Sequence, residues 1–448
     1  MATHRVTCLA LIPFVCLEAK AAPEQPSDFF NDSKLTVTAR NFYFNRDFRN
    51  GGSSSTGTNA SKPIADRNGY QEEWAQGFMA NFTSGFTPGV VGFGVDAYSF
   101  QGFKLDSGGG RTGLRLMPIG GDGKPEDSFN KAGGSFKIRY QDGLFQYGNL
   151  FPNVPVFAVN QVRLFPSSAT GWMLGWNVDK LHLDSGHFFS RGGVDSSNND
   201  DPITTDYALP LSIDSVSYVG GKYTVDKDLK LSLYGSELED VWRQYYANVN
   251  YRYEIDQAQA VLVDANLYRT LDTGRQLASV INNTTWSISV GYRYLQHTFT
   301  LAYQKVDSDE PMDWAAFGTM GGSVSLANAV QYATFTEPNE RSFQARYDLD
   351  MAAFGVPGLT FMTRYVTGDQ VSNRDSNNTF YTRRFVYPAG SDPRHWERDI
   401  EARYVVQSGP AKDLSVRLRQ ATHRSSTGYR YPDDDEIRVI IDYPISIF

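Results

Sequence analysis

The chain has 448 residues, of which 41% are hydrophobic and 14% aromatic, and its formal net charge is −8. This length suits two or three soluble domains or one large barrel, and the negative charge argues against nucleic acid as a partner. Beyond the N-terminus no apolar run approaches the ~18 residues that a membrane helix needs, whereas barrel strands are apolar on one face only and keep the mean hydropathy low.

The first residues predict a signal peptide over about 1–22, because the segment from Val6 to Leu17 is apolar and small residues follow it. Both cysteines, Cys8 and Cys16, lie in this segment. The rest of the chain, residues 23–448, then has no cysteine, which excludes disulfides and cysteine-based redox chemistry. With only six histidines besides, we expect no metal site and no cofactor, and we interpret 23–448 as a single domain.

Alternation of apolar and polar residues recurs along this domain. It is clear at 35–43, at 135–140 and at 286–294, and no stretch sustains a helical stripe. Successive side chains of a strand point to opposite faces, so each segment has one apolar and one polar face. The pattern predicts an all-β protein.

The predicted connections alternate between short and long. The short ones carry the Gly, Pro and Asp of tight turns and lie at 141–143, 225–228, 295–297, 355–358 and 408–412. The long ones are polar and lie at about 45–73, 105–132, 190–214, 305–341, 367–398 and 423–435. This asymmetry is typical of an outer-membrane barrel. A large sandwich or a propeller is the alternative, but a propeller would repeat every ~40–50 residues and the sequence shows no such repeat.

The chain ends on an alternating segment, Glu436–Phe448, whose last residue is aromatic. The last strand of a membrane barrel routinely ends in this way, because it pairs with the first strand and closes the cylinder. Phe448 shares its register with Arg438, so strict alternation would turn the terminal ring inward. We expect a bulge near Pro444 to restore its outward position.

Arginines recur on the polar faces of the predicted strands at Arg40, Arg346, Arg364, Arg403, Arg417, Arg419 and Arg438. If the apolar faces meet lipid, these arginines line the lumen, where a planar guanidinium binds carboxylates. A column of such sites would guide an anion inward. Alternatively, the arginines pair with the carboxylates of the wall and fill a polar interior; those carboxylates are Asp348, Asp399, Glu401 and Asp442. Both situations can hold at different positions.

Nine longer segments resemble the OprD family of outer-membrane channels of pseudomonads over nearly the whole mature chain. They are 40–46, 92–97, 163–166, 232–240, 243–246, 298–305, 356–361, 405–414 and 442–446. The resemblance implies a transmembrane antiparallel β-barrel of 18 strands in the cell outer membrane, with inward-folded constriction loops. It implies passive, selective diffusion of small carboxylate-bearing nutrients, such as amino acids, short peptides and organic acids, by a monomer or a loose homotrimer. A channel for aromatic monocarboxylates is the alternative, although the chain is more similar to the amino-acid and peptide branch.

The resemblance also implies roles for individual residues. A basic ladder on one wall, here called the arginine ladder, matches Arg403, Arg417, Arg419 and Arg438. Arg163 matches an arginine of the narrow eyelet and Tyr332 a residue facing it. Members that take basic amino acids have acidic residues where this chain has Gly322 and Thr334. We therefore predict a channel that is not tuned for lysine or arginine, unless Asp307, Asp309 or Asp313 supplies the missing charge.

A Ser/His/Asp set offers an enzymatic alternative, because serine-peptidase activity has been proposed within the family. The matching residues are His187, Asp240 and Ser323. A triad needs the histidine within hydrogen-bond reach of both partners and an oxyanion hole. Nothing near Ser323 resembles a nucleophile elbow, so we expect a channel rather than an enzyme. A barrel that merely anchors an adhesin or receptor is a further alternative, but the long loops lack a repeat or a separate folded module.

Overall fold

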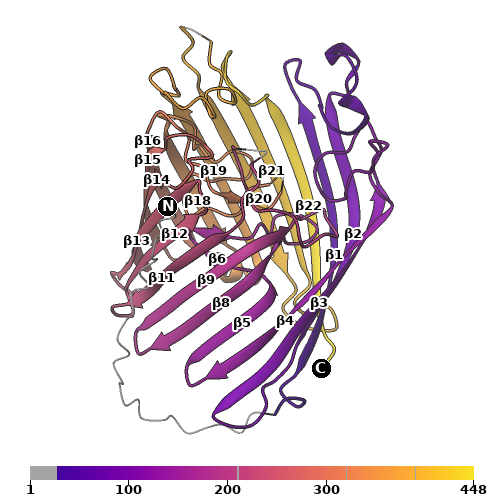
Figure 1. The fold of residues 1–448 in the computed structure, drawn as a ribbon, viewed down its shortest axis with the longest axis vertical. Helices are drawn as coiled ribbons and strands as arrows, with labels where there is room; N and C mark the ends of the chain where they lie inside the picture. Colours follow the sequence, from indigo (N-terminus) through magenta and orange to yellow (C-terminus); the bar gives the residue numbers. More distant parts are fainter. Residues whose placement is uncertain (1–27, 209–210, 319, 389) are drawn as a thin grey trace, which may run out of the picture.

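Eighteen antiparallel strands, each paired with the strand before and after it, form one closed sheet (Figure 1). The computed structural model describes residues 28–208, 211–318, 320–388 and 390–448; the expected signal peptide therefore lies outside the described residues. The strands of the wall are β1 (Lys34–Phe48), β2 (Tyr70–Thr83), β3 (Val91–Asp106), β4 (Ser128–Tyr140), β5 (Gly143–Leu150), β8 (Ser168–Val178), β9 (Leu181–Gly192), β11 (Val216–Thr224), β12 (Leu229–Leu238), β13 (Trp242–Glu254), β14 (Gln259–Asp272), β15 (Asn282–Tyr294), β16 (His297–Asp307), β18 (Arg341–Asp350), β19 (Leu359–Asp369), β20 (His395–Val405), β21 (Ser415–Ser425) and β22 (Asp434–Ser446).

The barrel closes where the last strand meets the first. β22 pairs antiparallel with β1 from Thr36↔Ser446 to Phe48↔Asp434, as the alternating C-terminus predicts. The bulge expected near Pro444 is absent from this pairing, which runs without a shift in register. Pro444 is tolerated because the pairing of β22 with β21 already ends at Asp442, so no partner there needs the missing N–H.

The outer face of the barrel is an apolar band between two aromatic levels. On β15 the exposed side chains run in the order Trp286, Ile288, Val290 and Tyr292. At about 3.3 Å per residue, the two aromatic residues stand roughly 20 Å apart along the strand. Aromatic girdles at the two interfaces flank the apolar band of a membrane barrel in the same way.

Short turns connect the strands at one end and long loops at the other (Figure 1). Two-residue turns join β4 to β5 and β15 to β16, and each uses a left-handed residue, Gln141 (φ 50°) and Leu295 (φ 53°). The strands reach further than the sequence predicted; the loop expected at 105–132 spans only 107–127 between β3 and β4. The loop 151–167 between β5 and β8 is not among the long connections predicted from the polar segments, although the resemblance implies a loop that carries Arg163.

Several loops fold into the barrel (Figure 1), and their apolar side chains form a buried cluster with residues of the wall. They carry two small sheets, formed by β6 (Asn153–Val154) with β7 (Phe157–Ala158) and by β10 (Thr204–Thr205) with β17 (Ala315–Ala316). Phe157 of β7 packs on Phe188 of the wall at 5.2 Å between ring centroids, and on Phe317 at 5.2 Å. Apolar burial therefore holds the inward-folded loops in place.

Helical structure in the described residues is limited to three short 3₁₀ turns, η1 (Gly57–Asn59), η2 (Ile64–Asp66) and η3 (Ala352–Phe354). None of these described helices is long or apolar enough to cross a membrane.

The outward direction of β15 gives a test of the barrel's orientation in lipid. Val290→Arg places a charge in the middle of the apolar band and should lower the free energy of unfolding by about 2–4 kcal/mol. Ser289→Arg, one residue away on the lumen side, should change it by less than about 1 kcal/mol. Urea unfolding in lipid vesicles measures both values. Equal losses for the two variants would contradict the assignment of the faces.

Candidate functional site

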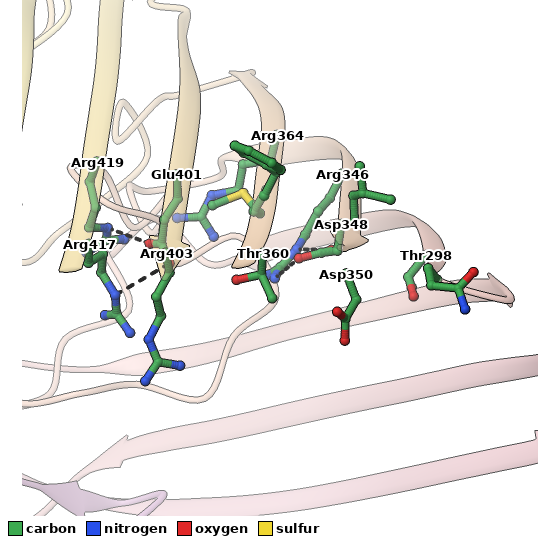
Figure 2. Close-up of a pocket in the computed structure, with 14 residues that line it drawn as sticks. Thr298, Arg346, Asp348, Asp350, Thr360, Arg364, Glu401, Arg403, Arg417 and Arg419 are labelled. Atoms are coloured by element: carbon green, nitrogen blue, oxygen red, sulfur yellow. Dashed lines mark hydrogen bonds and ion pairs between the residues drawn. The ribbon is translucent and has the colours of Figure 1, made fainter. Parts of the chain in front are cut away.

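Arginines on the inner face of neighbouring strands line a cavity of about 430 Å³ in the half of the barrel nearer the short turns (Figure 2). The basic residues of this cavity are Arg346, Arg364, Arg403, Arg417 and Arg419, and its acidic residues are Asp348, Asp350 and Glu401. They come from β18, β19, β20 and β21, where alternation places them on the face opposite to the exposed apolar residues.

Two of these arginines are neutralised by carboxylates of the wall. Arg364 lies 2.6 Å from Asp399, and the side chains are only 10% and 1% exposed. Arg346 donates two hydrogen bonds of 2.7 Å to the carboxylate of Asp348. The two-pronged pair of Arg346 and the buried single contact of Arg364 each hold a guanidinium against a carboxylate and leave little charge for a solute. The pairing alternative raised by the sequence thus holds at these positions.

The arginines nearest the short turns are freer. Glu401 lies between Arg417 at 3.5 Å and Arg419 at 2.9 Å, so one carboxylate faces two cations. The Nε of Arg419 is buried and lacks the alignment of a hydrogen bond. Arg403 is exposed and makes no hydrogen bond or ion pair with any residue that the structure describes. In Figure 2 its guanidinium points away from the other pairs.

Farther from the short turns, loops 151–167 and 308–340 meet β1 and β22, and we refer to this place as the constriction. A buried carboxylate, Glu436, binds Arg438 and Arg46, each at 2.5 Å. Both guanidinium groups lie over the ring of Phe44, at 4.4 and 5.7 Å from its centroid. Arg46 follows Arg40 at even spacing on β1, so the alternation that selected Arg40 also marks Arg46.

Arg163 brings the loop 151–167 to the same ring. Its guanidinium lies 5.3 Å from the centroid of Phe44, and its Nε donates to the carbonyl of Leu114 at 2.8 Å. Arg40 ties this loop to the wall, because it binds Asp442 at 2.7 Å and donates to the carbonyl of Arg163 at 2.9 Å. Arg40 and Arg163 therefore meet at the constriction.

Tyr332 reaches the constriction from the loop 308–340. The guanidinium of Arg46 lies 4.9 Å from the centroid of its ring. The backbone N–H groups of Tyr332 and Ala333 donate to the carboxylate of Glu397, both at 2.8 Å. Glu397 is buried on β20 and thus holds this loop against the wall. Arg46 thus contacts both Tyr332 and Phe44, and Phe44 in turn contacts Arg163.

A third loop, 107–127, is held by one buried carboxylate. Glu73 on β2 accepts hydrogen bonds from the backbone of Gly113 (2.7 Å), Leu114 (3.0 Å) and Leu116 (2.7 Å). The residue between the last two, Arg115, is left-handed with φ 65°. Its half-buried side chain makes no hydrogen bond or ion pair within the described part of the chain. Nothing in the sequence marks Arg115, because its conformation depends on Glu73.

Of the three aspartates suggested for an acidic side, one is exposed and two accept hydrogen bonds from other groups of the protein. Asp307 ends β16 on the outward-facing side and is exposed. Asp309 accepts a hydrogen bond from Asn339 at 2.6 Å. Asp313 is buried and accepts from the N–H of Tyr207 at 3.0 Å and from the hydroxyl of Tyr381 at 3.0 Å. Burial, together with nearby Asp206, raises the pKa of Asp313 to about 6.

Asp206 is the acidic group of the inward-folded loops that neighbours several arginines. Its Oδ1 accepts from the N–H of Gly321 at 2.7 Å. Burial raises the pKa of this carboxyl, and the N–H of Gly321 and the charges of Arg430, Arg384 and Arg115 oppose that rise. The charge on Asp206 is thus felt in the same part of the lumen as Arg115.

The two positions without carboxylates have clear structural roles. A Cβ added at Gly322 would stand 2.0 Å from the carbonyl oxygen of Ala158, so no side chain fits there without a shift of the backbone. Thr334 shares hydrogen bonds with Thr336 (2.7 Å) and the hydroxyl of Tyr207 (3.1 Å). Close packing of loop 308–340 on the β6–β7 hairpin accounts for the glycine.

The serine, histidine and aspartate of the enzymatic alternative each have other partners. His187 Nδ1 lies 2.8 Å from Ser217 Oγ. Asp240 binds Arg275 at 2.6 Å, and Ser323 Oγ donates to the carbonyl of Val159 at 3.4 Å. The described contacts of these three residues contain no link among them, as a triad would need. The described residues also contain no group of three or more His, Cys, Asp or Glu that could hold a metal ion.

Comparison with known proteins agrees with this geometry. The sequence matches the outer membrane porins of the OprD family over residues 27–447. It is 43% identical to Porin D of Pseudomonas aeruginosa over 427 residues, which cover 94% of this chain and 92% of that protein. The structure resembles that of OprD from P. aeruginosa, with a TM-score of 0.79 and 41% sequence identity. The match covers 96% of this chain and 98% of that chain. It also resembles the structure of OpdK from P. aeruginosa with vanillate, with a TM-score of 0.80 and 32% sequence identity. This match covers 94% of this chain and 100% of that chain.

Arg364 and Arg403 lie on the same wall, and replacing each one distinguishes an arginine that stabilises the fold from one that has no partner. Arg364→Met leaves the buried carboxylate of Asp399 without its cation and should lower the free energy of unfolding by about 3 kcal/mol. Arg403→Met removes a cation that has no partner and should change it by less than about 0.5 kcal/mol. Urea unfolding of both variants measures the difference. Similar values would mean that Arg364 and Asp399 do not form a stabilising pair.

Proposed function

This chain belongs to the OprD family of outer-membrane porins, which take up substrates selectively, and on that premise we propose that it carries small carboxylate-bearing nutrients. Amino acids, short peptides and organic acids are the solutes that fit. Transport is passive diffusion down a concentration gradient, needs no cofactor and involves no catalysis. The channel works as a monomer or within a loose homotrimer.

The unneutralised arginines of the exit wall carry this proposal. Arg403 has no partner among the described residues, and Arg417 shares Glu401 with Arg419. A carboxylate that arrives here gains charge-assisted hydrogen bonds without displacing a tight pair. Since Arg403 and Arg417 are exposed or partly exposed in this cavity, each contact is weak enough to release the solute to the next.

The constriction supports a path along the same wall. A carboxylate from the outside would pass Arg163, Arg46 and Tyr332, then Arg438, and leave along the arginine ladder. The buried carboxylates of Glu436 and Asp434 balance the charges of Arg438 and Arg46, so the excess positive charge comes from Arg163, which forms no ion pair with the described residues. Water is scarce where loops and wall meet, which strengthens charge–charge contacts relative to bulk solvent.

The weak acidic side of the constriction favours neutral or acidic solutes over basic ones. Gly322 and Thr334 offer no charge to a substrate ammonium, and Asp313 is occupied by backbone N–H groups. The charges of Asp195 and Asp206 act on Arg115, and Arg384 and Arg430 also act on Asp206, while Glu337 is paired with Arg430. Because these carboxylates already face arginines, they leave little charge for the second cation of lysine or arginine.

Removing the free arginines tests the role of the ladder. In proteoliposomes, Arg403→Ala combined with Arg417→Ala should lower glutamate uptake by roughly five- to tenfold and leave an uncharged sugar unchanged. Arg398→Ala is the matched control, because Arg398 lies on the same strand as Arg403 but is exposed on the outward face. An equal loss for glutamate and the sugar would point to a collapsed pore.

A substrate panel tests the selectivity. Purified protein in liposomes should admit glutamate and a Gly-Glu dipeptide faster than arginine, because the carboxylates of the constriction are already bound to arginines or to backbone N–H groups. Benzoate tests the aromatic alternative, which the likeness to OpdK with vanillate keeps open. Arginine as the fastest solute would overturn the assignment of the acidic side, and benzoate as the fastest would favour an aromatic-acid channel.

A further inference from the structure

The wall opposite the arginine ladder carries two lysines without partners. Lys222 lies on the inner face of β11 and Lys230 on the inner face of β12. In the ring of eighteen strands β11 is the eighth and β21, which holds Arg417, is the seventeenth, so half the circumference separates them. All three residues lie towards the short turns, hence at the same level of the lumen.

The two lysines face one cavity of about 640 Å³. Its remaining polar lining is supplied by Asn177, Asp179, Lys180, His182, Thr224, Ser232, Asn248 and Asn250. The register pairs Lys222 with Ser232 and Lys230 with Thr224, so the two lysines are diagonal neighbours on one face. Diagonal neighbours stand about 7–8 Å apart at the backbone, within reach of long side chains. Both ammonium groups can therefore converge on one small anion.

Their lack of partners sets these lysines apart from others that point into the protein. Lys131 donates to three backbone carbonyls at 2.9–3.1 Å, and Lys137 binds Asp96 at 2.6 Å. Lys222 and Lys230 are exposed and make no hydrogen bond or ion pair with the residues for which coordinates are described. Two like charges side by side oppose folding when nothing neutralises them, so a role in binding accounts for them better than one in stability.

The nearby acidic groups are mostly occupied. Asp184 accepts from the hydroxyl of Tyr234 at 2.5 Å and lies 3.0 Å from His182. Asp264, two strands from Lys230, accepts from Asn248 at 2.9 Å and from two further asparagines. Asp179 is in a turn at the edge of the cavity and faces the three lysines Lys180, Lys222 and Lys230. The cavity thus has an excess of positive charge.

A polar track connects this cavity with the constriction. A second cavity of about 460 Å³ runs from Ser323 and Ser325 of the loop 308–340 to Lys222, Ser232 and Asn248. The last three residues line both cavities. Asp264 also lines this second cavity, where its carboxylate accepts from three asparagines. A solute that has passed the loop can therefore follow hydroxyl and amide groups past Asp264 to the lysines, without crossing to the ladder.

We propose that Lys222 and Lys230 form a second anion-binding subsite, which holds the carboxylate of a solute on its way out along the wall opposite the ladder. The subsite rests on the proposed function for its ligand, a small carboxylate. With cations on both walls, the exit half of the lumen attracts anions over its whole cross-section. The electrostatic contribution falls with ionic strength, because the site is open to water.

The test is the ion selectivity of single channels in planar bilayers. Lys222→Gln combined with Lys230→Gln should lower the permeability of glutamate relative to potassium roughly two- to threefold at low salt. The difference should fade near 1 M salt, where charges are screened within about 3 Å. Lys222→Arg with Lys230→Arg should retain the wild-type ratio. Lys227→Gln with Lys412→Gln is the matched control, since both of these lysines are exposed on the short turns.

The chloride-to-potassium ratio of the same channels separates this inference from the proposed function. A wild type that conducts but does not favour glutamate over an uncharged solute would refute the proposed function, while a lower chloride ratio in the glutamine variant would still support an anion site. If the wild type is selective for glutamate but the glutamine variant keeps the same permeability of glutamate and of chloride relative to potassium, the subsite is overturned and the proposed function stands.

Discussion

The whole structure depends on the pairing of every strand edge. A backbone N–H or carbonyl that faces lipid without a partner costs several kcal/mol, so a sheet can stand in a membrane only as a closed cylinder. Here β22 supplies the partner of β1 over thirteen residue pairs, from Thr36↔Ser446 to Phe48↔Asp434. Closure fixes the register of the wall, and the register decides which side chains face lipid and which face the lumen.

Buried carboxylates hold the inward-folded loops in position inside the barrel. Glu73, Glu397 and Asp313 are each at most 4% exposed, and each accepts backbone N–H groups of an inward-folded segment. Bonds to a charged acceptor are stronger than those between neutral groups, and losing one would leave a buried charge unsatisfied. The shape of the constriction is therefore set by acidic residues that cannot serve as ligands, because their lone pairs are already in use.

The sequence predicted the residues that strand geometry places, but not those that the inward-folded loops place. Alternation predicted the barrel and placed Arg403 and Arg417 on the inner face, because strand geometry alone determines which way a side chain points. It could not find Arg115, whose left-handed conformation exists only because Glu73 binds its neighbours. Nor could it distinguish Asp313, whose oxygens accept hydrogen bonds from Tyr207 and Tyr381, from Asp206. Both residues lie in loops whose course depends on tertiary contacts.

The ladder itself changes character along its length. Side-chain exposure rises from 3% at Arg438 to 16% at Arg419 and 38% at Arg417. Near the constriction an arginine held at 2.5 Å by Glu436 acts as a fixed part of the aperture, and its rigidity keeps the opening narrow. Near the exit a loosely held arginine can turn towards a passing carboxylate and let it go again. The proposed passage of carboxylates needs both properties, and the degree of burial of each guanidinium decides which one it provides.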